Sequence, residues 1–359
     1  MSSVDIVIPC YNYAHFLRQS VASVLSQDGV DVRVLIIDDC SSDDSETVGR
    51  QLAEQENRVE FRRHPINHGH IATYNEGLLE WASADYSMLL SADDAIAPGA
   101  LARAAELMDQ EPEVGMTCGM GRVIWDDENY AGKTEISSAE NRIVSSAVFL
   151  RRCFQMGNPV CTPTAVVRTE LQHRLGGYRA DLPHSGDMEM WMRFAVHGPV
   201  GIHQAVQAYY RRHSANMSIQ YDSQLLGDLS EVLQACEQIL AQWGDHFPES
   251  AQWHEMMLQR ISHGCCWLAS SAFDRGDTEG YHTCLDFAEQ VCPGIRDSRL
   301  WKKIQVKALL GNTCWQMIRP TWERFRALRK SLSSNNVPMV FQTNQLTGWW
   351  PEAHECRSA

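Results

Sequence analysis

Short apolar runs alternate with amphipathic segments through the first half of the chain. Runs rich in Val, Ile and Leu predict buried strands at residues 4–8, 32–37, 59–61 and 87–90. Between the first two runs, residues 16–25 place apolar side chains three and four positions apart, which predicts a helix with one buried face. Strands and helices that alternate at this spacing are typical of an α/β fold, with a mostly parallel central sheet and helices on its faces.

The same pattern continues to about residue 215 and then changes. Strand-like runs occur at 114–124, 160–168 and 203–213, and helical patterns occur at 145–156 and 188–197. Beyond about residue 220 long helical patterns dominate, with breaks near residues 244, 276 and 293. We expect three parts: an α/β domain over 1–218, an α-helical region over 219–332, and a loosely ordered tail over 333–359.

Paired acids follow two of the predicted strands, Asp38-Asp39 after one and Asp93-Asp94 after another. Carboxyl ends of parallel strands meet at one rim of a sheet, where ligands bind. Neighbouring carboxylates repel each other unless a cation or hydrogen-bond donors lie beside them, and Mg²⁺ or Mn²⁺ binds carboxylate and phosphate oxygens. These acids can instead only cap the helices that follow, an interpretation that suits Asp39 and Asp93 less well.

Composition and charge exclude several classes of protein. The formal net charge of −14 disfavours nucleic acid as a partner. Twelve cysteines without a CxxC pair disfavour structural zinc and a disulfide framework, and they favour a reduced, cytoplasmic protein. The first residues have no basic, apolar leader, and no apolar run reaches membrane-spanning length, so we expect neither a secretory signal nor a membrane span.

Six short motifs follow one another within residues 3–215. They are VDIVIPCYN at 4–12, IIDDCSSD at 36–43, NHG at 67–69 with NEGL at 75–78, LSADD at 90–94, GD at 186–187 before WMR at 191–193, and YRRH at 210–213. In this order they resemble the motifs of an inverting family 2 glycosyltransferase with the A-type nucleotide-sugar fold. Each motif alone is weak evidence, whereas six in order make the resemblance specific.

The resemblance implies an enzyme that moves a sugar from a nucleoside-diphosphate sugar, by default a UDP-sugar, to an acceptor hydroxyl. The acceptor would be a glycan, a lipid-linked molecule or a protein, and the product a surface glycan or glycoconjugate. It also implies a divalent cation, Mn²⁺ or Mg²⁺, held by Asp93, Asp94 and His213, and it makes Asp187 the catalytic base. Donor-binding residues carried over from the motifs are Pro9, Tyr11, Asn12, Asp38, Asp39, Asn75, Ser91, Ala92 and Asp93.

Two departures from the family pattern keep an alternative open. Ser91 stands where the first acid of the metal motif is expected, and Gly186 replaces the Glu that normally precedes the base. Both substitutions motivate a non-catalytic relative that binds a nucleotide sugar or a protein partner. Without the family context, Asp187 can equally be a helix N-cap and His213 a surface histidine.

The segment 313–332 has two open interpretations. It combines apolar residues with four Arg and one Lys in a helical pattern. Such a basic amphipathic helix can lie on the inner face of an anionic membrane, which would make the protein peripheral. Alternatively, it is a packed terminal helix with a solvated basic face.

Overall fold

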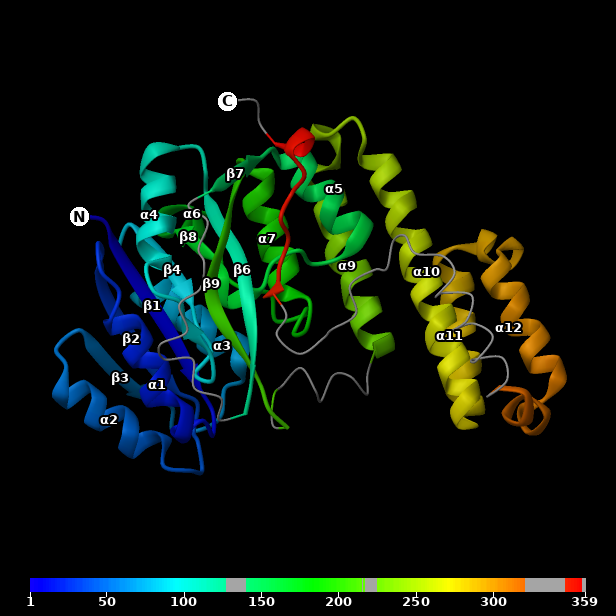
Figure 1. Ribbon diagram of the computed structural model, residues 1–359, viewed down its shortest axis with the longest axis horizontal. Coiled ribbons are helices and arrows are strands. Elements are labelled where there is room, and N and C mark those ends of the chain that lie inside the picture. Colours follow the sequence, from blue (N-terminus) through cyan, green and yellow to red (C-terminus); the bar gives the residue numbers. More distant parts are fainter. Residues whose placement is uncertain (127–139, 215, 217–224, 320–345, 357–359) are drawn as a thin grey trace.

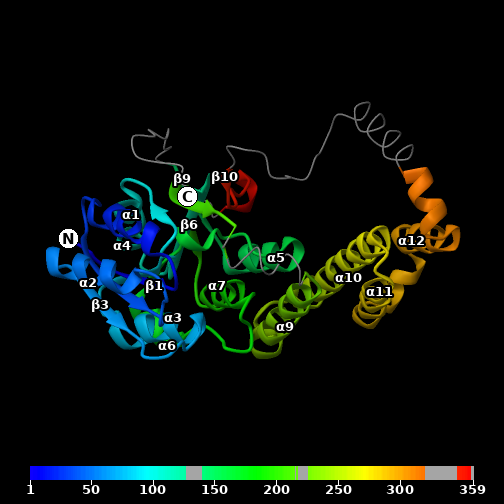
Figure 2. The same cartoon turned by 90° about the horizontal axis from the view of Figure 1, so that it is seen from below.

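A computed structural model describes residues 1–126, 140–214, 216, 225–319 and 346–356. In Figure 1 a twisted sheet with helices against it forms one part of the molecule, and helices α9 to α12 extend from it as an arm. Figure 2, turned by 90°, shows the same helices extending away from the part that contains the sheet. The α/β fold and the helical C-terminal region expected from the sequence are both confirmed.

The central sheet is parallel in its first half and mixed in its second. Its strand order is β3-β2-β1-β4-β8-β6-β9-β5, with β7 paired to β9 and β10 paired to β6. Strands β3, β2, β1 and β4 run parallel, whereas β8 is antiparallel to both β4 and β6. The strands are β1 Ser3–Cys10, β2 Asp31–Asp38, β3 Val59–Arg63, β4 Tyr86–Leu89, β5 Ala95–Ile96, β6 Met116–Trp125, β7 Asn141–Val144, β8 Val166–Arg168, β9 Val200–Arg212 and β10 Leu346–Thr347.

Both faces of the sheet are buried, as the continuous apolar runs predict. In β1 the side chains of Val4, Ile6 and Ile8 pack with one core, while Val7 packs with the other. This alternation follows from the two-residue period of a strand. Helices α1, α2 and α4 supply the first core, and α3, α5, α6 and α7 supply the second.

The helices begin and end close to where the sequence pattern places them. Helix α3 continues directly into a π-helical turn, Glu76–Trp81. The other helices of the α/β part are α1 Ala14–Leu25, α2 Ser45–Gln55, α4 Ala100–Gln110, α5 Ser146–Met156, α6 Thr169–Leu175 and α7 Gly186–Val196, and α3 spans His70–Asn75.

The C-terminal arm is built from four helices that share the second core. They are α9 Leu225–Trp243, α10 Ser250–Arg275, α11 Thr278–Val291 and α12 Arg299–Leu310. The breaks expected near 276 and 293 are present: Gly276 ends α10 with a φ of 78° and a 3-10 turn occupies Pro293–Asp297. The expected boundary at 218/219 lies outside the described residues.

Two predictions on the C-terminal third fall largely outside the described chain. Of the segment 313–332 only 313–319 is described, and of the tail 333–359 only 346–356. In the tail, β10 pairs with β6, and the Arg142 guanidinium lies 4.3 Å from the ring centroid of Trp350. None of the helices in the described ranges is long and apolar enough to cross a membrane.

Candidate active site

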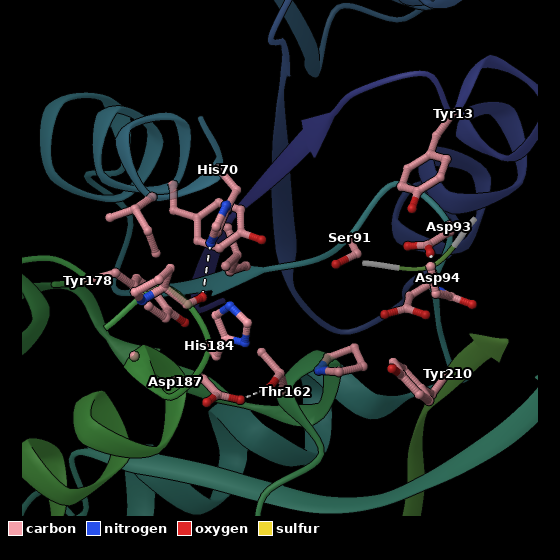
Figure 3. Close-up of a pocket in the computed structure, with 17 residues that line it drawn as sticks. Tyr13, His70, Ser91, Asp93, Asp94, Thr162, Tyr178, His184, Asp187 and Tyr210 are labelled. Carbon is pink, nitrogen blue, oxygen red and sulfur yellow. Dashed lines mark hydrogen bonds between the residues drawn. The ribbon is translucent and has the colours of Figure 1, made fainter. Parts of the chain in front are cut away.

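One pocket opens at the rim where the sheet's strands carry their acids, and Figure 3 shows the side chains around it. Its volume is about 250 Å³. Tyr13, Ser91, Asp93, Asp94 and Tyr210 lie toward one end, and Asp187, Thr162, His184, Tyr178 and His70 lie toward the other. The remaining lining residues are Ile71, Tyr74, Leu89, Pro163, Pro183, Gly186 and Asn216.

The acid pair at one end of the pocket is buried and tightly held. Asp93 Oδ2 accepts a hydrogen bond from Asn216 Nδ2 at 3.0 Å and lies 3.1 Å from His213 Nε2. Asp94 Oδ1 accepts one from the Arg211 backbone N–H at 2.8 Å. Burial raises the pKa of Asp94 well above its ordinary value, and the neighbouring charge of Asp93 raises it further. The backbone N–H and the charge of Arg211 oppose this rise in the pKa of Asp94 without cancelling it.

Asp187 faces the pocket from the first turn of α7. Its Oδ2 accepts hydrogen bonds from Thr162 Oγ1 at 2.8 Å and Asn158 Nδ2 at 3.0 Å, and its Oδ1 accepts one from Met188 N at 2.6 Å. Burial raises the pKa of Asp187, and these hydrogen bonds to the charged form oppose the rise. The helix cap is Ser185, so Asp187 is not the N-cap that the pattern alone allows.

The predicted acids Asp38 and Asp39 end β2, but their oxygens hold neighbouring loops. The Arg63 guanidinium donates to Asp38 Oδ2, and Ser41 N donates to Asp38 Oδ1 at 3.0 Å. Asp39 accepts hydrogen bonds from the backbone N–H groups of residues 68 and 69 at 2.8 and 2.9 Å. Its Oδ1 also lies 2.7 Å from His64 Nδ1. Although burial alone would raise the pKa of Asp39, hydrogen bonds from His64 and the two N–H groups lower it below its ordinary value.

The predicted residue Pro9 lies near the end of β1, and the loop after the strand holds the predicted residues Tyr11 and Asn12. The Tyr11 side chain is half exposed, with 50% of its area accessible. Asn12 has a φ of 61°, and its Oδ1 accepts a hydrogen bond from Ser42 N at 2.8 Å, which joins this loop to the one after β2. The loop therefore leaves an aromatic ring available beside the carboxyl ends of β1 and β2.

Of the residues predicted from the sequence, Ser91, Asp93, Asp94 and Asp187 line one pocket, and His213 contacts it through Asp93. Among the described residues, the other predicted donor-site residues lie outside this lining: Pro9, Tyr11, Asn12, Asp38, Asp39, Asn75 and Ala92. The Asn75 amide instead holds the backbone of Tyr178, donating to its carbonyl at 2.8 Å and accepting from its N–H at 2.6 Å.

Sequence reasoning missed several lining residues. Thr162, Tyr178, His184 and Asn216 line the pocket and were not singled out from the pattern. His184 is three residues before Asp187, so its place in the loop that leads to α7 was a usable signal. Asn216 has no such signal, because its role depends on a turn that brings it back to Asp93.

The comparison with known families decides what kind of site this is. Residues 5–171 match the family model described as glycosyl transferase family 2. Residues 5–171 therefore form a glycosyl transferase family 2 domain. The matched segment contains the acid pairs of β2 and β4, and Asp187 follows it by sixteen residues.

One similar protein matches just over half of this chain. An uncharacterized protein of Mycobacterium tuberculosis is 26% identical over 208 residues, covering 55% of this chain and 63% of that protein. The chain therefore spans just under two thirds of that relative.

Two solved structures share the fold. TarS of S. aureus in complex with UDP has a TM-score of 0.60 and 14% identity, over 98% of this chain and 97% of that one. The mannosyltransferase PcManGT of Pyrobaculum calidifontis, in complex with GDP-Man and Mn²⁺, has a TM-score of 0.53 and 15% identity, over 86% and 79%. At these identities the likeness shows the fold alone.

Proposed function

We propose that the protein is an inverting, metal-dependent glycosyltransferase that moves a sugar from a nucleoside-diphosphate sugar to an acceptor hydroxyl. The observation that carries the proposal is a single pocket with the Asp93-Asp94 pair toward one end and Asp187 toward the other. Transfer needs these two functions on opposite sides of the anomeric carbon: one stabilises the leaving diphosphate and the other removes the acceptor proton.

The acid pair suits a divalent cation. Its two carboxylates are adjacent and buried, and burial together with the charge of Asp93 raises the pKa of Asp94, although Arg211 opposes the rise. No group of three or more His, Cys, Asp or Glu side chains that could hold a metal occurs within the described residues. This fits an ion such as Mg²⁺, which takes one or two carboxylates from the protein and completes its shell with substrate phosphates and water. When bound, the ion would offset the charge of the leaving diphosphate.

Asp187 is the proposed base. The acceptor oxygen attacks the anomeric carbon from the face opposite the diphosphate, the bond to the diphosphate breaks, and the acceptor proton passes to an Asp187 oxygen. One base suffices because this single displacement forms no covalent intermediate with the enzyme. The hydroxyl of Thr162 and the amide of Asn158 fix the carboxylate in place before the substrate binds.

The donor nucleotide would lie along the ends of β1 and β2. The half-exposed ring of Tyr11 can stack on the base, with Asn12 in the same loop and Pro9 near the end of β1. Asp38 and Asp39 shape this edge by ordering the loops beside it. UDP and GDP-Man bound to the two solved neighbours support a nucleotide-sugar donor, and we take UDP as the default.

Ser91 and His213 complete the proposed donor end. Ser91 lines the pocket at the position where the family motif has an acid, and its hydroxyl can hydrogen-bond a ribose or a metal-bound water. His213 Nε2 contacts Asp93 and so holds that carboxylate in place. We assign residues 1–218 to this catalytic domain and expect the reaction to take place in the cytoplasm.

A donor panel tests the proposal. The full chain is incubated with UDP- and GDP-sugars, with and without Mn²⁺, while the unfolding midpoint and nucleotide release are measured. We expect at least one donor to raise the midpoint in an Mn²⁺-dependent way and to be turned over. Asp93→Asn should abolish the Mn²⁺ dependence, whereas Asp286→Asn, an exposed acid on α11, should behave as wild type. Equal turnover in wild type, Asp93→Asn and Asp187→Asn would contradict it.

A further inference from the structure

We infer that the acceptor is an uncharged sugar, held at the Asp187 end of the pocket by an aromatic wall and by His184, which the C-terminal arm orients. This inference rests on the proposed glycosyltransferase function and adds the chemical class of the acceptor. It also gives helix α9 a part in binding that substrate.

The charge of the lining points to a neutral acceptor. No Lys or Arg side chain lines the pocket among the residues that the structure describes. Asp187 lies at the end where the acceptor must enter, and Asp93 and Asp94 lie at the other. At the Asp187 end, a carboxylate or phosphate on the acceptor would lie near this acid, and none of the described lining residues is a Lys or Arg that could pair with it, which disfavours uronic acids and sugar phosphates.

An aromatic wall gives this end of the pocket the shape that a pyranose needs. Tyr74 and Tyr178 meet edge to face with ring centroids 5.5 Å apart, and His70 packs on Tyr74 at 5.4 Å. The apolar face of a sugar ring packs on such rings, while its hydroxyls bond the polar groups beside them. Burial raises the pKa of Tyr178 well above its ordinary value, so its phenol stays neutral.

The aromatic wall is held in place by hydrogen bonds between residues that are far apart in the sequence. The Asn75 amide makes two hydrogen bonds to the Tyr178 backbone, at 2.8 and 2.6 Å. Residue 177 is glycine at a point where a Cβ atom would lie 2.1 Å from the Asn75 amide oxygen. The wall therefore has one geometry before the acceptor arrives, which lowers the entropy lost on binding.

His184 is oriented by the arm. Its Nδ1 lies 2.6 Å from Asp228 Oδ1, and the backbone N–H groups of His184 and Ser185 donate to Glu231 Oε2 at 2.8 and 3.1 Å. Asp228 and Glu231 both come from α9. The His184 Nε2 lies 4.0 Å from Glu231 Oε1, so carboxylates of α9 lie near both ring nitrogens and hold the ring in one orientation at the pocket.

The position of His184 supports a role in binding the acceptor. Its ring lines the pocket beside Asp187 and Thr162, as Figure 3 shows. The loop that carries it is also fixed from the opposite side, where His70 Nε2 lies 3.1 Å from the Pro183 carbonyl. An acceptor hydroxyl bound by His184 would thus be placed against the base by a loop anchored on both flanks.

Matched acceptors test the class of sugar. Using the full chain and the donor found in the panel, kcat/KM is measured for pairs of glycosides that share an aglycone and differ only in oxidation of C6, a glucoside against a glucuronide and a galactoside against a galacturonide. We expect the neutral member to be preferred by about tenfold or more, as for an unpaired charge beside carboxylates. Equal or better use of the uronide, or donor hydrolysis with no glycoside accepted, would overturn the inference.

Two variants test His184, with matched controls. His184→Gln and Asp228→Asn should each raise the acceptor KM about tenfold, a change equivalent to losing one positioned hydrogen bond. The unfolding midpoints of both variants should stay close to the wild-type value, which separates the loss of an acceptor contact from a general loss of folding. Exposed His282→Gln and Asp286→Asn on α11 serve as controls. An unchanged acceptor KM in both variants refutes the role of His184, and a protein that neither binds nor hydrolyses any donor refutes the proposed function itself.

Discussion

Replacing Asp187 by Asn removes the proton acceptor and keeps nearly the same shape. The carboxylate now accepts from Thr162, Asn158 and Met188, all donors, so the amide must turn its oxygen toward some of them and its NH₂ toward others. A positioned base contributes about 10²- to 10⁴-fold to a rate. At 1.36 kcal/mol for each tenfold step, this corresponds to a barrier higher by about 3–5 kcal/mol.

The same substitution should leave the fold and the donor site intact. Burial raises the pKa of Asp187, so the charged form is costly in the fold, and losing the charge offsets part of the lost hydrogen bonding. We therefore expect unfolding free energy to change by no more than about 2 kcal/mol. Nucleotide release under saturating substrates gives kcat, and calorimetric titration gives the donor Kd.

The expected result is kcat lowered at least about 100-fold with a donor Kd within about twofold of wild type. Exposed Asp286→Asn is the matched control for the Asp-to-Asn change. An Asp187→Asn variant that keeps more than about a tenth of the wild-type kcat would refute the assignment of the base.

Three further predictions concern charge and pH. Thr162→Val removes a hydrogen-bond donor to the charged form of Asp187 and should raise the pKa of Asp187. The acid side of the pH profile of kcat/KM, where activity falls with falling pH, should therefore move to higher pH. An acid side that stays at the wild-type pH contradicts this prediction. Burial and Asp93 raise the pKa of Asp94 in the folded protein, so the metal-free fold loses stability as pH rises above the unfolded pKa of about 3.9. Asp94→Asn should therefore have a higher melting temperature than wild type at neutral pH. This difference in melting temperature should shrink on acidification or when Mn²⁺ is added to wild type. Burial acts to lower the pKa of His64, but its contacts with Asp39 and Glu76 outweigh this effect and raise the pKa. The extra unfolding free energy of wild type over His64→Gln, measured by chemical denaturation, should therefore be full below about pH 6.5 and lost as pH rises through the raised pKa. A difference that does not change with pH would count against this ion-pair network.

Local sequence patterns predicted the elements of the α/β part well because each strand and helix is specified by its own residues. The acids at the ends of β2 and β4 could be placed on one rim from the sequence alone, since carboxyl ends of parallel strands converge. The antiparallel insertion of β8 between β4 and β6 was not predictable, because Val166–Arg168 is a three-residue strand whose pairing is set by tertiary contacts.

The residues of the candidate site were likewise only partly predictable from the sequence. Asp93, Asp94 and Asp187 came from motifs, whereas the structure shows what surrounds them. The contact of His184 with Asp228 joins residues 44 apart, and that of Asn75 with Tyr178 joins residues 103 apart. No local period encodes such pairs, so the aromatic wall and its supports emerge only once α3, α7 and α9 are packed together.

The central claim is transfer with inversion, and proton NMR of the reaction tests it most directly. The full chain is incubated with the donor selected by the panel, Mn²⁺ and a neutral glycoside, and the anomeric signals are followed over time. We predict a new glycosidic anomeric proton of the configuration opposite to the donor's, which grows as nucleoside diphosphate is released. A product that keeps the donor's configuration, or nucleotide release without any glycoside formed, would contradict inversion at this site.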